Sequence, residues 1–239
     1  AFQAIAALFG IGDYGPARER LESHSDMDPS SLGWKFVASM LALDRTYRAL
    51  PAEECCELAI RALAGGDLVR ADSGLTVFGA INTLVYADRP EADRYWEQLQ
   101  AESHQRGSLF AISGLHMWQG HALARRGELS DAEQMLRQAL DEFNLYGYGA
   151  GAHVYLRAFL AACQLDRGDA AGARRTLDEA RDPGDTSDAA GFWLYAKIRI
   201  LLAEGRHDEV IEIADALAAR RPDVLNPAIW RWRNPKAIA

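Results

Sequence analysis

Apolar residues recur at helical spacing along most of the chain, and the clearest case follows Ser130. From Ala132 onward they fall at steps of 0, 3, 4, 7, 8 and 11, which places them on one face of an α-helix. A glycine, Gly127, precedes this pattern, and Ser130 with Glu133 has the spacing of an N-terminal capping box. Residues 123–143 therefore predict the turn and the second helix of a helical hairpin.

The same hairpin recurs at intervals of about 40 residues, which is the spacing of a repeat architecture. Turns that resemble Gly127-Glu128 occur at Gly168-Asp169, Gly205-Arg206, Ala87-Asp88 and Gly12-Asp13. Between Gly12 and Ala87 there is room for one further hairpin, whose turn is expected within residues 47–51.

Small and apolar residues occupy fixed positions relative to these turns. Five residues after the turn stand Ala17, Ala92, Ala132, Ala173 and Val210, and seven before it stand Ile5, Ala80, Gly120, Ala161 and Ile198. Nine residues after it stand Leu21, Trp96, Leu136, Leu177 and Ala214. Twelve residues after it, in the last four hairpins, stand Leu99, Ala139, Ala180 and Leu217. Small pairs such as Gly120 and Ala132 would let the two helices of a hairpin approach closely. Because one hairpin buries only part of its apolar face, stacking between neighbours must supply the rest.

The pattern predicts an all-α fold with no sustained strand alternation. Expected helices span 2–10, 16–23, 30–47, 51–64, 73–86, 90–105, 107–126, 130–145, 148–167, 170–181, 188–204 and 207–221. They pair into one domain, residues 1–239, of about six antiparallel repeats at roughly 1–25, 30–64, 72–106, 107–146, 148–182 and 188–222. Residues 223–239 are expected to begin a truncated repeat. Since the chain opens at Ala1 directly into a helical pattern, we expect an excised piece of a longer protein.

Composition limits the classes of function. The formal net charge is −8, and an acidic surface repels phosphate, so we expect no direct binding of nucleic acid. No apolar run is long enough for a membrane span. The cysteines Cys55, Cys56 and Cys163 are odd in number and lack zinc-site spacing, which favours reduced thiols in a cytoplasmic protein.

Catalytic and metal-binding patterns are not found in the sequence. His116 and His121 are five residues apart, which puts them about 140° apart around a helix rather than on one metal-binding face. No nucleophile-elbow or phosphate-loop motif occurs. We therefore expect a protein that is not an enzyme and that needs no cofactor or metal.

A stacked-hairpin protein binds its ligands on the concave wall, which the first helix of each hairpin lines. Counting back from the turns nominates Met117, His121, Arg125, Tyr155, Tyr195 and Arg199. Aromatic rings and guanidinium groups together can stack on and hydrogen-bond a sugar, a peptide or a small metabolite. The alternative is that Met117 and the tyrosines are ordinary core between repeats and the arginines are solvated.

Trp230 and Trp232 follow the last complete hairpin. In a longer protein they would pack under a further repeat. In this chain we expect them to be partly exposed, which would allow self-association through them.

The small-residue pairs, the turns and the pitch resemble tetratricopeptide repeats, and imply a right-handed superhelix. Over residues 50–233 the chain is also similar to the sensor region of large LuxR-type, ATP-binding transcriptional regulators of the maltose-activator kind, common in actinobacteria. The similarity lies in Leu-Pro-Ala-Glu-Glu (50–54), Ala-Asp-Arg-Pro-Glu-Ala (87–92), residues 121–133 and Asn-Pro-Ala-Ile-Trp-Arg-Trp-Arg (226–233).

This resemblance implies a function in transcriptional regulation. The chain would be the non-catalytic region that senses an effector or partner, joined to a nucleotide-binding module and a helix-turn-helix, and it would control activation and oligomerisation. ATP and DNA binding would belong to those other parts. The alternative is a constitutive protein–protein scaffold with no small-molecule effector.

Overall fold

A computed structural model of the chain describes residues 1–8, 14–72 and 74–239. All regular secondary structure in these ranges is helical, which confirms the predicted all-α class. The chain forms two compact units. The first contains Ala1–Trp118 with Asp223–Ile229, and the second contains Gln119–Pro222 with Trp230–Ala239. The predicted superhelix and its number of repeats stay predictions.

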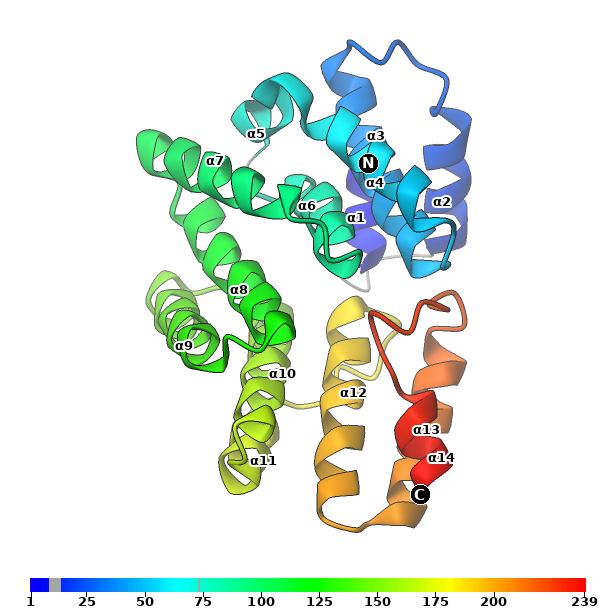
Figure 1. The fold of residues 1–239 in the computed structure, drawn as a ribbon, viewed down its shortest axis with the longest axis vertical. Coiled ribbons are helices and arrows are strands. Elements are labelled where there is room, and N and C mark those ends of the chain that lie inside the picture. The colour runs from blue at the N-terminus through cyan, green and yellow to red at the C-terminus, as the bar shows by residue number, and fades with distance from the viewer. Residues whose placement is uncertain (9–13, 73) are drawn as a thin grey trace. The chain divides into compact units, whose positions relative to one another are not determined.

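The first unit is built on α3, which packs against α4 and α6. Its helices are α1 (Phe2–Leu8), α2 (Tyr14–Ser23), α3 (Leu32–Tyr47), α4 (Ala52–Leu63), the 3-10 turn η1 (Ala64–Gly66), α5 (Asp67–Ala71), α6 (Val77–Tyr86), α7 (Glu91–Arg106) and the first part of α8 (Leu109–Arg126) (Figure 1). The pattern did not predict η1 or α5, which fill the connection between α4 and α6.

The second unit is centred on α10 and α12, which pack against each other. Its helices are the rest of α8, then α9 (Leu129–Tyr146), α10 (Ala150–Asp166), α11 (Ala170–Asp178), α12 (Asp188–Ala203), α13 (His207–Arg220) and the short α14 (Arg233–Ile238) (Figure 1). α10 also contacts α9 and α11, and α12 contacts α13. Most predicted helix boundaries in this unit hold to within one or two residues, although α11 ends three residues early.

Five hairpin turns share one backbone geometry. At each, a residue in the left-handed conformation follows the first helix, and the next residue donates its N–H to the carbonyl five positions back. The left-handed residues are Ala49, Asp88, Gly127, Gly168 and Gly205. The bonds run from Leu50, Arg89, Glu128, Asp169 and Arg206 to Arg45, Leu84, Leu123, Gln164 and Leu201, at 2.9–3.1 Å. The turn expected within residues 47–51 is therefore confirmed, while Gly12-Asp13 lies outside the described residues.

The positions that the repeat register singled out are all buried. Gly120 shows why a small residue stands there, because a Cβ added to it would lie 2.9 Å from Leu136 and 3.4 Å from the carbonyl of Ala132. Ala161 and Ala173, the corresponding pair in the next hairpin, have no exposed surface. The interpretation of these pairs as packing devices is confirmed for α8 and α9.

The predicted capping box at Ser130 is wrong. α9 begins one residue earlier, at Leu129, with Glu128 at its N-cap position and no side-chain cap. Glu133 instead accepts hydrogen bonds from Arg137 on its own helix and from Arg167 at the end of α10. A contact with the next hairpin thus replaces the local cap.

α6 begins at Val77, four residues later than predicted, because Asp72 holds the preceding chain. Its carboxylate accepts bonds from the backbone N–H groups of Leu75 at 2.8 Å and Val77 at 2.9 Å, and from the hydroxyl of Thr76 at 2.9 Å. Asp72 is itself buried. The predicted helix at 73–86 therefore loses its first turn to a capped bend.

The C-terminal residues contain little regular structure, and their interpretation as the start of a further repeat stays a prediction. Residues 221–232 contain no helix, and only α14 follows. Trp230 is 2% exposed and packs edge-on against Phe192, with ring centroids 5.4 Å apart. Its expected partial exposure is wrong, because the ring fills a space above Gly191, where any Cβ would overlap it. Trp232 is half-buried, with the guanidinium of Arg233 over its ring.

Candidate functional site

Side chains nominated for ligand binding meet in the second unit, in a group of five rings that we call the aromatic cluster. His121 on α8 stacks on Phe159 of α10 at a centroid distance of 4.1 Å and meets Phe192 of α12 edge-on at 5.7 Å. Tyr155 contacts the same two phenylalanines at 6.0 and 5.8 Å, and Trp230 completes the cluster. Such offset and edge-on contacts are the preferred geometries of aromatic rings.

His121 is the titratable member of this cluster. Burial, aided by the charge of Arg125 one turn further along α8, lowers the pKa of His121 to about 3. The imidazole is therefore neutral at physiological pH, and it packs as a flat aromatic ring.

The aromatic cluster is closed to solvent over most of its area. Tyr155 is 4% exposed, and Phe159, Phe192 and Trp230 are buried as well. Met117, another nominated residue, is buried in the part of α8 that belongs to the first unit. For Tyr155 and Met117 the structure thus favours the alternative stated from the sequence, that they are core.

Tyr195 and Arg199 form a second pair on α12 that solvent can reach. The guanidinium of Arg199 lies 6.0 Å from the centre of the Tyr195 ring, and it forms an ion pair with Asp166 at the end of α10. Both residues are half-buried. A carboxylate ligand could bind here by displacing Asp166, while the tyrosine ring offers a stacking surface.

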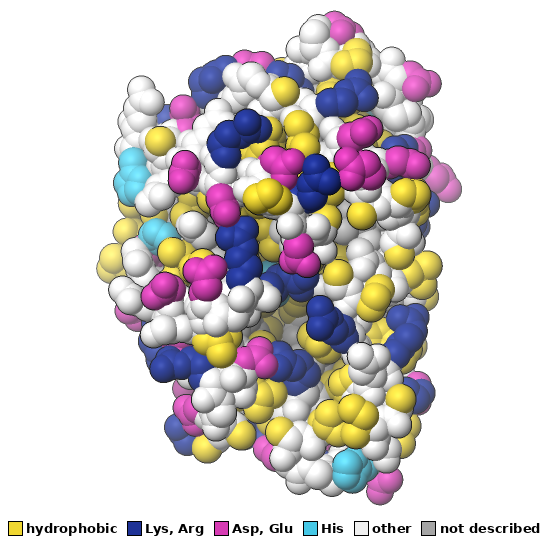
Figure 2. Space-filling view, in the orientation of Figure 1, with side chains coloured by type: hydrophobic (Ala, Val, Ile, Leu, Met, Phe, Trp, Pro, Cys, Tyr) yellow, Lys and Arg dark blue, Asp and Glu magenta, His cyan; other side chains and the backbone are white. Residues whose placement is uncertain are grey.

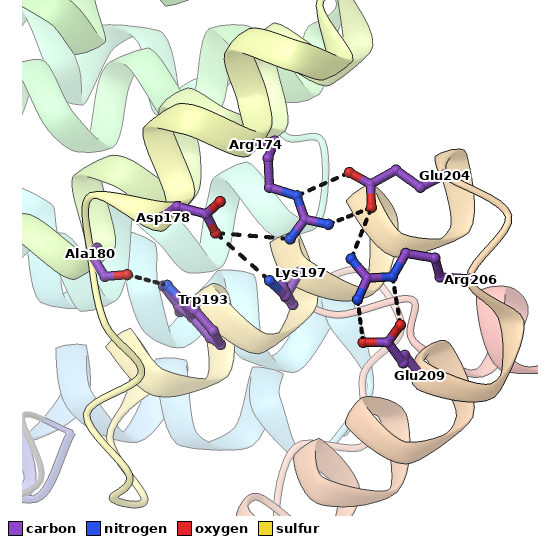
Figure 3. A network of polar contacts seen from close by, with 8 residues as sticks. All are labelled: Arg174, Asp178, Ala180, Trp193, Lys197, Glu204, Arg206 and Glu209. Atoms are coloured by element: carbon purple, nitrogen blue, oxygen red, sulfur yellow. Dashed lines mark hydrogen bonds and ion pairs between the residues drawn. The ribbon is translucent and has the colours of Figure 1, made fainter.

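Charged side chains also link α11, α12 and α13, as Figure 3 shows. Glu204, at the end of α12, accepts bonds from Arg174 at 2.9 Å and Arg206 at 3.3 Å, and Arg206 binds Glu209 through both of its carboxylate oxygens. The hydrogen bond from Arg174 is the main cause that lowers the pKa of Glu204.

The other end of this network lies beside an indole ring. Asp178 lies 3.9 Å from Arg174 and 3.7 Å from Lys197, whose amine stands 5.8 Å from the centre of the Trp193 ring (Figure 3). The Trp193 N–H donates to the carbonyl of Ala180 at 3.2 Å. Three basic and three acidic side chains balance in the whole network, so it joins neighbouring helices and leaves no net charge to attract a ligand.

On the face that Figure 2 shows, acidic and basic side chains are interspersed over the described residues, although the net charge is −8. The three cysteines are buried free thiols. Among the described residues, no three His, Cys, Asp or Glu side chains are grouped so that they could hold a metal ion. Every helix in the same ranges is too short or too polar to cross a lipid bilayer.

The sequence did contain a signal for two residues that the nominated set omitted. Phe192 stands thirteen residues before Gly205, as Tyr155 does before Gly168, and Asp166 stands two before Gly168, as Arg125 does before Gly127. The structure adds Phe192 to the aromatic cluster and Asp166 to Arg199. Phe159 lies off this register, and only the packing of α10 reveals it.

No protein-family model, curated protein or solved structure matches this chain.

Proposed function

We propose that this chain is a non-catalytic helical-hairpin module that binds a partner or a small effector, and that it serves as the sensor region of a LuxR-type regulator. The observation that carries the first part is the backbone geometry that the hairpins share at their turns, which lie at Ala49, Asp88, Gly127, Gly168 and Gly205. Repeated hairpins present a series of equivalent helix faces to a ligand. The regulator assignment rests on the sequence resemblance alone.

The surface proposed for binding is the pair Tyr195 and Arg199 with Asp166. It combines a ring, a fork of N–H donors and an acid that a ligand carboxylate can replace. His121 and Tyr155 support it from the core, because their cluster with Phe192 fixes α10 and α12 against each other. Binding would act on the parent protein by favouring one of its conformations, and it would need a different affinity for each.

A thermal-shift screen of sugars, nucleotides, amino acids and short peptides tests the binding function. We expect at least one compound to raise the melting temperature, and Arg199→Ala to weaken that effect at least tenfold in apparent affinity. Arg174→Ala is the matched control, since Arg174 is equally part of an ion pair on a neighbouring helix. A compound that binds both variants as well as the parent chain would move the site elsewhere.

The regulator assignment has its own test. The coding sequence on either side of this segment should specify a phosphate-binding loop upstream and a helix-turn-helix downstream. If neither is present, the assignment to a LuxR-type regulator is wrong, whether or not the segment binds a small molecule.

A constitutive protein–protein scaffold is the second candidate. The burial of Tyr155 and Met117 favours it, because two of the six nominated groups cannot reach a small ligand. The scaffold would be supported over the sensor if no compound raised the melting temperature and if one protein partner were captured that Arg199→Ala releases.

A further inference from the structure

The C-terminal end of α3 is covered by a segment that comes from far along the chain. The backbone N–H groups of Leu225 and Asn226 both donate to the carbonyl of Tyr47, at 2.8 and 3.0 Å. The side-chain amide of Asn226 donates to the carbonyl of Thr46 at 2.9 Å. The last carbonyls of a helix have no partners within the helix, so the segment supplies donors where the helix needs them.

Two apolar side chains of the same segment, one on each side of Asn226, are buried. Val224 and Ile229 are each 4% exposed, whereas Leu225 between them is 50% exposed. Asp223 lies 3.7 Å from the guanidinium of Arg18, which also binds the buried Asp44 of α3 at 2.7 Å. The segment therefore carries an acid at Asp223, buried apolar side chains at Val224 and Ile229, and an asparagine between them that binds α3.

The conformation of the segment is fixed by its own asparagine. The Oδ1 of Asn226 accepts from the N–H of Ala228 at 2.9 Å, and the Asn226 carbonyl accepts from Ile229 at 3.1 Å. Asn226 thus uses both ends of its side-chain amide, one to shape the segment and one to bind α3. Residues 223–229 contain no helix or strand of their own.

We propose that the end of α3, with Arg18, is a recognition site for an extended peptide, and that the chain fills it with its own residues Asp223–Ile229. The segment acts as an intramolecular ligand, because its contacts are those of a bound peptide: donated backbone N–H groups, one specific amide and an acid beside Arg18. A peptide with the same residues can compete for the site. This site belongs to the first unit, whereas the binding surface proposed on α12 belongs to the second.

The test uses the full chain, labelled with nitrogen-15, and a synthetic peptide of residues 222–229. Saturating peptide should shift the amide signals of Tyr47 and Arg48 and accelerate hydrogen exchange at Leu225 and Asn226 at least tenfold. The same peptide with alanine in place of asparagine should have no effect. Asn226→Ala in the chain weakens the intramolecular competitor, so the peptide should bind that variant about tenfold more tightly.

Two further variants keep the test decisive. Leu225→Ala is the matched control in the segment, since its side chain is exposed, and it should leave peptide affinity unchanged. Asp223→Asn weakens the contact with Arg18 and replaces Asn226→Ala if that variant does not fold. Failure of millimolar peptide to bind either weakened variant would overturn the proposal and leave the segment a fixed part of the first unit.

Discussion

The two units bury different kinds of side chain. Most of the buried polar residues among the described ones belong to the first unit. There Ser39 of α3 donates to the carbonyl of Thr76 and accepts from the N–H of Ala80. The second unit contains the aromatic cluster instead, in which the ring centroids of Phe159 and Phe192 lie 4.9 Å apart.

The difference follows from how the helices are connected. The hairpin turns of both units pair their own backbone groups through the bond from the residue after the left-handed position. The first unit has an irregular connection between α4 and α6, whose backbone needs outside partners. Lys35 donates to the carbonyl of Ala64, and Arg106 donates to those of Val69 and Asp72. Regular repeats can have apolar cores, whereas a departure from the repeat needs buried polar groups.

The largest expected effect comes from removing such a polar group. Asp72→Ala leaves the buried N–H groups of Leu75 and Val77 without their acceptor and should lower the free energy of unfolding by about 3 kcal/mol. Asp169→Ala removes an exposed cap, the bond from the N–H of Gly172, and should cost about 1 kcal/mol. Urea denaturation followed by circular dichroism measures both, and equal losses would refute the contrast between the units.

The aromatic cluster should be sensitive to one added carbon. Gly191→Ala places a Cβ into the Trp230 ring and should lower stability by about 2 kcal/mol. Gly151→Ala, on α10, meets nothing within 4 Å and should instead raise stability by about 0.5–1 kcal/mol. In a Trp230→Ala background, Gly191→Ala should no longer destabilise, which a double-mutant cycle can check. A persistent cost there would mean that Trp230 is not the obstacle.

His121 should make the second unit sensitive to acid. Its pKa of about 3 in the folded chain lies below the ordinary value of 6.5, so the unfolded chain takes up the proton first as pH falls. Stability from this group is complete above about pH 6.5 and falls by up to about 1.4 kcal/mol per pH unit toward pH 3. In His121→Phe, the free energy of unfolding should therefore fall less between pH 7 and pH 5 than it does in the parent chain. His104→Gln, on an exposed part of α7, should not change it, and a parallel pH profile for His121→Phe would exclude this role.

The smallest expected effect tests whether the turn at Ala49, which lacks glycine, belongs with the other hairpin turns. Ala49 has φ of 59° where three of the five turns have glycine, and a left-handed alanine is strained by about 1 kcal/mol. Ala49→Gly should raise stability by about 0.5 kcal/mol, after allowance for the greater freedom of glycine in the unfolded chain. Gly127→Ala should instead lower stability. Calorimetric melting temperatures compare the two, and a destabilising Ala49→Gly would separate that turn from the set.

The sequence predicted the parts of the candidate site that depend on helix periodicity. It placed His121 and Tyr155 on first helices, and the structure brings both onto Phe159 and Phe192. It left open whether Tyr155 faces a ligand or packs in the core, because burial depends on which residues arrive from elsewhere. Trp230 is such a residue in the same cluster: it packs against Phe192, although the sequence interpretation had left it partly exposed.

Local patterns determined the helices and their turns, since periodicity, left-handed residues and small pairs act over a few residues. Tertiary structure decided which polar groups are shared between distant segments. Glu133 had the spacing of a cap, yet Arg167 of the next hairpin binds it. Asn226 follows the last predicted hairpin with no helical pattern around it, yet it binds the end of α3. In both cases the partner lies beyond the reach of local spacing, because a carboxylate or an amide binds whichever complementary group the packed helices bring to it.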